Sequence, residues 1–152
     1  MNSELRRIFE EDQRDRTQRP LPESLAERDA DRRERVHALI DAGGLVEPAD
    51  YYHAAMVFQH GVELADYWQA RELALKAADM GYRQARWLAA AVYDRWLLTQ
   101  GRPQKYGTQY RAVAGKWVLW DVDPETTDEE RSRWDVPPLA EAKRQAIDLS
   151  RS

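Results

Sequence analysis

The stretch PADYYHAAMVFQHGVELADYWQARELALKAADMGYRQARWLAAAVYDRWLLTQG, residues 48–101, decides the fold. It contains three runs rich in Ala, Leu and aromatic residues, and the runs end at Gly61, Gly81 and Gly101. Glycine often ends helices because it adopts the left-handed backbone conformation without strain. The pattern therefore predicts three consecutive helices with short links and antiparallel neighbours. The predicted helices span about 48–60, 64–80 and 82–99.

The segment before this stretch predicts two further helices, over about 3–17 and 23–42. Ser3 is the candidate N-cap of the first, Pro20 lies beyond its end, and Gly43 ends the second. The charged run ERDADRRER, residues 27–35, is expected to form a solvated face supported by ion pairs between residues four apart.

The segment after Gly101 differs in composition. RPQKYGTQ, residues 102–109, is typical of a loop, and QYRAV and KWVLW on either side of Ala114-Gly115 predict a β-hairpin at about 109–121. Two more helices are expected over about 127–134 and 138–149. Trp68 and Trp87 are expected to pack between helices.

These elements predict an all-α fold, an antiparallel stack of five main helices with a short β-hairpin and a C-terminal helix. A length of 152 residues suits one domain. The expected parts of this single domain, 1–152, are an N-terminal helix pair, a central helical-hairpin region, and a C-terminal part with the loop and hairpin. They span 1–47, 48–101 and 102–152.

Composition excludes several classes of protein. The chain has no Cys, so disulfides, thiolate nucleophiles and Cys-ligated metals are excluded. Fifteen aromatic residues beside 33% charged residues indicate a folded protein with a polar surface. No run approaches the ~18 apolar residues of a membrane span, and the start MNSELRRIFEEDQRDR lacks the apolar stretch of a signal peptide. We therefore expect a cytoplasmic protein with no membrane partner.

Charge is unevenly distributed along the chain. The net charge is -4, yet residues 81–116 hold seven basic residues and a single acidic residue, Asp94. This block packs against acidic flanks of its own chain, or it forms a site for an anionic small molecule or peptide that carries a carboxylate or phosphate. An acidic chain without a sustained basic stripe is not expected to bind nucleic acid.

The central stretch resembles helical-hairpin repeats of the tetratricopeptide and Sel1-like type. Ala54-Ala55 recurs 35 residues later as Ala89-Ala90, and AADMGYRQA is similar to the small-residue turn that joins such repeats. The whole chain also resembles a family of short bacterial domains of unknown function. The matching pieces are IFEEDQRDR, ADYYHAAMVFQHG, ARWLAAAVYDRWL, GRPQKYGTQ and VPPLAE. This resemblance implies a helical fold and no established activity.

Polar residues interrupt several of the apolar helix faces. They are Asp12, Gln13, Arg16, His53, Gln59, His60, Asp94 and Arg95. An unpaired buried charge costs several kcal/mol, so these groups must be partnered, line a cavity or reach solvent. One interpretation is a structural network that pairs Asp12 with Arg95, or Asp94 with Arg16. The other is a ligand pocket between helices.

The pocket interpretation also involves the loop, where Gln104, Thr108 and Gln109 offer neutral hydrogen-bonding groups. The predicted binding residues are Gln13, Arg16, Gln59, Arg95, Gln104, Thr108 and Gln109. The leading hypothesis is a non-catalytic binding domain for a small or peptidic anion, with the ligand held by Arg95 and the loop. Another hypothesis is a protein-interaction scaffold whose polar core only fixes helix register.

The alternative to binding is a small cofactor-independent enzyme of hydrolase or lyase type. His53 or His60 would act as the base, oriented by Asp12 or Asp94. Seven residues of helix separate the two histidines by roughly 10 Å, so they do not share one metal ion. The sequence therefore predicts neither a metal site nor a cofactor.

Overall fold

The computed structural model describes residues 1–151, and within them the chain forms seven helices and one two-stranded sheet. The predicted fold class is confirmed: the protein is mostly helical, with a short β-hairpin and a C-terminal helix. The chain divides into two compact units, residues 1–85 and the part from residue 86 onward, and each is described by itself. The single domain expected from the length stays a prediction.

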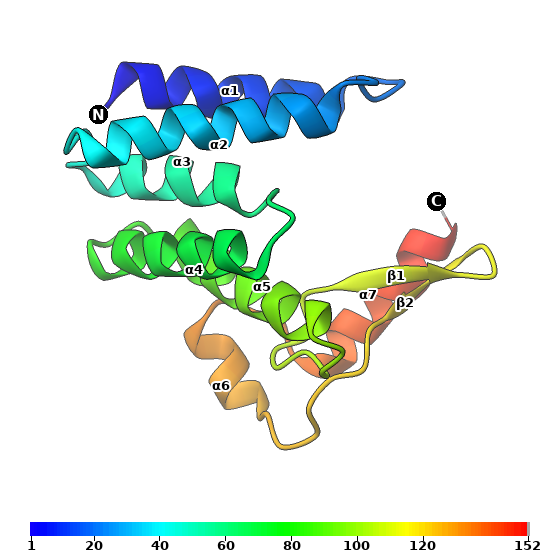
Figure 1. The fold of residues 1–152 in the computed structure, drawn as a ribbon. Coiled ribbons are helices and arrows are strands. Elements are labelled where there is room, and N and C mark those ends of the chain that lie inside the picture. The colour runs from blue at the N-terminus through cyan, green and yellow to red at the C-terminus, as the bar shows by residue number, and fades with distance from the viewer. Residues whose placement is uncertain (152) are drawn as a thin grey trace. The chain divides into compact units, whose positions relative to one another are not determined.

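The first unit contains four helices in which successive members run in opposite directions (Figure 1). They are α1 (Ser3–Thr17), α2 (Leu25–Asp41), α3 (Pro48–Phe58) and α4 (Leu64–Asp79). α1, α2 and α3 contact one another, and α3 also packs along α4. The core consists of apolar side chains from all four helices. Its members include Leu5, Ile8, Val36, Ala54, Ala55, Phe58, Ala70 and Ala74.

Hydrogen bonds at the helix ends show why these helices begin where they do. The N-cap of α1 is Asn2, not Ser3, because the Asn2 side chain accepts the Leu5 amide at 3.0 Å. α3 begins with a capping box in which Glu47 and Asp50 each accept the backbone N–H of the other. Gly61 is required at the link to α4, because an added Cβ would collide with the Asp66 side chain.

The second unit contains most of α5 (Gln84–Thr99), the strands β1 (Tyr110–Val113) and β2 (Lys116–Leu119), and the helices α6 (Asp128–Arg133) and α7 (Leu139–Arg151). The predicted hairpin is therefore confirmed. Its strands are antiparallel, with Tyr110 opposite Leu119 and Val113 opposite Lys116. Ala114 and Gly115 make the turn at φ 51° and 78°, the positive values that a tight hairpin turn requires. α7 packs on β2.

Two expectations about burial were wrong. Trp68 and Trp87 are 38% and 42% exposed, so neither is a core residue. In the run 27–35, Asp29 and Arg32 are buried instead of solvated. Among the helices of residues 1–151, none has both the length and the apolar character to span a membrane.

Candidate functional site

Three carboxylates and a guanidinium group lie buried where α1 faces α2. Asp12 and Arg32 are 1% and 3% exposed, and Asp15 and Asp29 are also buried. Arg16 donates two hydrogen bonds to Asp29, at 2.8 and 3.0 Å, and one to Asp12 at 2.8 Å. Arg32 donates to Asp15 and to Asp29, at 2.7 Å each. Every one of these carboxylates therefore contacts an arginine, and we call the five residues the arginine network.

Electrostatics within the arginine network favour the charged forms of Asp29 and Arg32. Burial acts to raise the pKa of Asp29, but hydrogen bonds from Arg16 and Arg32 hold that pKa below its ordinary value. Burial acts to lower the pKa of Arg32, but hydrogen bonds with Asp29 and Asp15 hold that pKa above its ordinary value. The Arg32 Nε is buried without a hydrogen bond and lies 3.7 Å from Asp12 Oδ1.

His60 joins the arginine network just beyond the end of α3. Its Nδ1 lies 3.0 Å from Asp12 Oδ1, and its side chain is 15% exposed. Gln13 donates to the other oxygen of Asp12, also at 3.0 Å. Gln59, the C-cap of α3, is buried with its Nε2 3.0 Å from Met56 Sδ. Of the two histidines proposed as a base, His60 therefore forms the expected pair with a carboxylate.

His53 lies in a different environment, in the apolar packing between α1 and α3. Its ring stacks on Phe9 with centroids 4.5 Å apart, and its Nδ1 is buried without a hydrogen-bond partner. Burial lowers the pKa of His53, with a further lowering by Arg6 that Asp50 opposes. This is the environment of a neutral core histidine.

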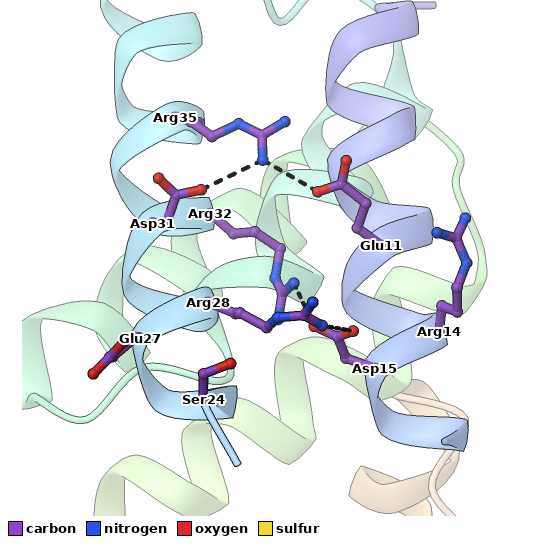
Figure 2. Close-up of a pocket in the computed structure, with 9 residues that line it drawn as sticks. All are labelled: Glu11, Arg14, Asp15, Ser24, Glu27, Arg28, Asp31, Arg32 and Arg35. Carbon is purple, nitrogen blue, oxygen red and sulfur yellow. Dashed lines mark hydrogen bonds and ion pairs between the residues drawn. The ribbon is translucent and has the colours of Figure 1, made fainter. Parts of the chain in front are cut away.

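The arginine network opens on one side into a groove of about 420 Å³. Figure 2 shows Arg35 reaching both Glu11 and Asp31, while Arg28 and Arg32 reach Asp15. The groove is lined by Glu11, Arg14, Asp15, Ser24, Glu27, Arg28, Asp31, Arg32 and Arg35. Four acidic and four basic residues balance there, so the groove has no net charge with which to select an ion.

The second unit buries a single carboxylate in another way. Asp94 on α5 is 0% exposed, and the loop after α5 wraps its side chain. Four consecutive backbone amides, Lys105 to Thr108, donate to its oxygens at 2.8–3.1 Å, and the Thr108 hydroxyl donates at 2.7 Å. Successive amides that converge on one point form an anion-binding concavity. Here the anion is a side chain of the same chain, and we call this arrangement the Asp94 cradle.

Neighbouring polar residues hold the Asp94 cradle in place. Gln104, 0% exposed, donates to the carbonyls of Gln109 and Trp120 and accepts the Gln109 amide. The Gln109 side chain accepts from Arg95 Nε and donates to Thr108, at 3.0 Å each. The side-chain amides of Gln104 and Gln109 and the Thr108 hydroxyl, which were expected to bind a ligand, therefore form hydrogen bonds within the chain.

Arg131 on α6 also bonds to the loop of the Asp94 cradle. It is 2% exposed, and its Nε donates to the Tyr106 carbonyl at 2.7 Å. Its Nη1 donates to the Thr126 carbonyl and to Asp128, at 3.0 Å each. Burial raises the pKa of Asp94, and the hydrogen bonds from Tyr106, Thr108 and Lys105 oppose that rise. The loop is thus fixed by both an internal anion and an internal cation.

A cavity of about 290 Å³ lies beside this loop in the second unit. Arg102 and Lys105 line it together with a single acidic residue, Asp123. Lys105 Nζ lies 3.6 Å from Glu130 at a site where both side chains are more than one third exposed, a weak pairing. The apolar wall is formed by Tyr93, Leu97, Pro103 and Pro124. Two cations beside an apolar wall suit a carboxylate that carries an apolar group.

The predicted residues therefore fall into separate sets. Asp12, Gln13, Arg16 and His60 form one cluster, and Asp94, Arg95, Gln104, Thr108 and Gln109 form another. Asp12 takes its bonds from Arg16, Gln13 and His60, and Asp94 takes its bonds from the loop. Each carboxylate is thus satisfied within its own unit. In residues 1–151, no group of three or more His, Asp or Glu side chains is placed to hold a metal ion.

Sequence reasoning missed Asp15, Asp29, Arg32 and Arg131, all of which are buried. A signal for two of them was present, since Leu25, Asp29, Arg32 and Val36 follow helical spacing on one face. No comparable pattern marked Arg131, whose partners are mainly backbone carbonyls.

No protein-family model, curated protein or solved structure matches the chain. The resemblances to helical-hairpin repeats and to a bacterial domain family therefore stay predictions.

Proposed function

We propose that this protein is a non-catalytic binding domain for a small or peptidic anion. The observation that carries the proposal is the cavity of about 290 Å³ at Arg102 and Lys105, within the basic block of the chain. Arg102 supplies a fork of donors that matches a carboxylate or phosphate, and Lys105 supplies a second positive charge. The apolar wall would receive the uncharged part of the ligand.

The Asp94 cradle supports this proposal because it makes the loop rigid. Lys105 donates its backbone amide to Asp94, so the position of its backbone is fixed. Its side chain is held only by the weak, exposed pairing with Glu130. A preformed loop loses little conformational entropy when a ligand binds. The residues expected to touch the ligand, Gln104, Thr108 and Gln109, would then act indirectly by holding the loop.

The test uses N-acetylphenylalanine as the probe and its uncharged methylamide as the comparison, with binding followed by calorimetry. We expect saturable binding of the acid alone, weakened about tenfold by Arg102→Gln or Lys105→Gln and weakened by salt. Arg133→Gln is the matched control, since Arg133 is exposed in the same unit and does not line the cavity. Equal binding of acid and methylamide, or no saturable binding, would refute the proposed site.

One observation favours a second candidate function, acid–base catalysis at His60. A carboxylate bonded to one ring nitrogen fixes the tautomer and orientation of a histidine and stabilises its protonated form. Asp12 and His60 have this geometry, with Asp12 Oδ1 3.0 Å from His60 Nδ1. In this version His60 is the base and Asp12 orients it.

The catalytic candidate is tested by screening ester, amide and phosphoester substrates with the unmodified protein, Asp12→Asn and His60→Gln. A His60-dependent reaction would lose about 10²–10⁴-fold in rate in the His60 variant. His37→Gln provides the control, because His37 packs edge-on against Phe58. A rate that His60→Gln leaves unchanged would eliminate this candidate.

A further inference from the structure

The β-hairpin of the second unit has two outer edges, and they differ. On β2, the Trp117 amide donates to the Ser150 hydroxyl of α7 at 2.9 Å, and that hydroxyl lies 3.3 Å from the Trp117 carbonyl. α7 packs on β2 and closes this edge at Trp117 (Figure 1). On β1, Arg111, Ala112 and Val113 are all exposed. The outer edge of β1 is thus accessible to a further strand.

The register of the hairpin decides which backbone groups of β1 point outward. Val113 is opposite Lys116 across a two-residue turn, and residues that flank such a turn bond to each other. Bonded and non-bonded pairs alternate along an antiparallel ladder, so the N–H and C=O groups of Ala112 and Tyr110 face away from β2. The Trp117 amide, opposite Ala112, also points outward, as its bond to α7 shows. This bond confirms the alternation.

The outward backbone groups of Ala112 are not used within the chain. Among residues 1–151, no group forms a hydrogen bond with the outward N–H or C=O of Ala112. Tyr110 is held by its phenol group, which lies 3.0 Å from the Ala142 carbonyl and 3.2 Å from Gln145 Oε1. An exposed strand edge with open donors and acceptors is a template for another strand. The small side chain of Ala112 leaves the backbone there accessible.

The charge of the hairpin indicates what kind of strand fits this edge. Alternation along a strand puts Arg111 and Val113 on one face of the sheet, and Lys116, opposite Val113, lies on the same face. The two strands contain these two cations and no acidic residue. Within residues 1–151, neither cation forms an ion pair. Arg111 lies over the Trp120 ring, 4.2 Å from its centroid, and a stacked guanidinium keeps N–H donors for a carboxylate.

We propose that the outer edge of β1 binds an extended acidic peptide, which adds to the hairpin as a third strand with a carboxylate opposite Arg111. Opposite charges on neighbouring strands attract each other, and basic residues on an edge discourage strands of like charge. A second copy of the chain, added through its own β1, would bring two further cations to the sheet and no acid. The surface is separate from the anion cavity, because no residue of β1 lines that cavity.

The experiment titrates the protein with a blocked peptide of about six alternating Val and Glu residues, the usual length of a strand. The comparison peptides carry Lys in place of Glu, or N-methyl groups on the amides that would donate to β1. We expect saturable binding of the unmethylated Glu peptide only. NMR should show exchange of the Ala112 amide slowed about tenfold or more, with less change at Arg111 and Val113, which already bond to β2. No saturable binding, or equal binding of the Lys peptide, would overturn the proposal.

Two variants separate the contribution of the backbone from that of the charge. Ala112→Pro removes the outward N–H at a position where an edge strand tolerates proline, and we expect binding to be lost. Arg111→Gln keeps the backbone, and we expect binding about tenfold weaker and less sensitive to salt.

The controls are Lys143→Gln, exposed on α7, and Arg102→Gln in the anion cavity, and both should bind the Glu peptide as the unmodified protein does. Unchanged binding in Arg111→Gln, or binding lost in Arg102→Gln, would contradict the proposal. Dimers of the protein alone by sedimentation, with the Ala112 amide already protected, would identify a second copy as the occupant and also overturn it.

Discussion

The two units bury carboxylates by different means. Between α1 and α2, Asp12, Asp15 and Asp29 contact arginine side chains, which carry full opposite charges. In the second unit, Asp94 accepts hydrogen bonds from four backbone amides and one hydroxyl. The first arrangement balances charge with charge, whereas the second satisfies a carboxylate with dipoles.

This difference determines which site tolerates substitution. Both partners of an arginine–carboxylate pair are side chains, so the whole set can be exchanged for apolar residues of similar volume. Backbone amides cannot be removed by substitution. Once Asp94 is lost, the amides of residues 105–108 lack an acceptor, and those of residues 106–108 are buried. We therefore expect the cradle to be the less replaceable of the two.

The largest effect is expected for Asp94→Leu, which removes the acceptor and fills its space so that water cannot replace it. Each buried donor left unsatisfied costs about 1–3 kcal/mol, so a loss of about 5 kcal/mol of unfolding free energy is expected. Urea denaturation measures that loss, and amide hydrogen exchange at residues 105–108 localises it. Asp94→Asn, which keeps one acceptor, should lose less. A loss below 1 kcal/mol in Asp94→Leu would show that the loop is not held by this carboxylate.

A smaller but still large effect is expected for Arg32→Leu. The substitution leaves Asp15 and Asp29 with fewer cations in a buried position, and breaking such a pair costs about 3 kcal/mol. The triple variant Asp15→Leu, Asp29→Leu and Arg32→Leu should recover at least half of this loss, as urea denaturation would show. The exposed pair of Arg35 with Glu11 is the control, and Arg35→Gln should change stability by about 0.5 kcal/mol or less.

If the triple variant proves less stable than Arg32→Leu alone, the comparison between the units fails. The arginine network would then resemble the cradle, with each member needed by the others. A recovery would instead confirm that the charges of the network are interchangeable with apolar packing.

Most of the fold could be predicted from the sequence because its signals are local. Glycines and prolines mark the helix ends, and the bounds of α3, α4 and α5 lie within two residues of those expected. The turn at Ala114-Gly115 and the β-branched and aromatic residues beside it gave the hairpin. The exposure of Trp68 and Trp87 could not be predicted. Helical spacing shows which residues share a face, but it does not show which face is covered.

The candidate site was predicted only in part. Interruption of apolar faces identified Asp12, His60 and Asp94 as polar groups that need partners, and each has partners. The partners of Asp94 could not be predicted from the sequence, because they are mainly backbone amides and nearly every residue carries one. The run ERDADRRER was interpreted as a solvated face because almost all of its residues are charged. The helical spacing that places Asp29 and Arg32 on the apolar face was given less weight.

The smallest of the three expected effects concerns pH and belongs to the first unit. Burial lowers the pKa of His53, so the unfolded chain binds a proton at a higher pH than the folded chain. The stability that neutral His53 contributes is therefore fully present above the ordinary pKa of about 6.5 and is lost as pH falls below it. One proton changes stability by at most about 1.4 kcal/mol per pH unit.

His53→Phe keeps a ring on Phe9 and removes the titration. Urea denaturation between pH 7.5 and 5 should show that the unmodified protein loses about 1 kcal/mol more than the variant over this range. Asp29 and Asp50, whose pKa values are held low by hydrogen bonds, act below about pH 4 and leave the comparison undisturbed. His37→Gln controls for histidine removal elsewhere. Parallel pH profiles for the unmodified protein and His53→Phe would mean that His53 has the same pKa in the folded and unfolded chains, which would contradict its burial in apolar packing.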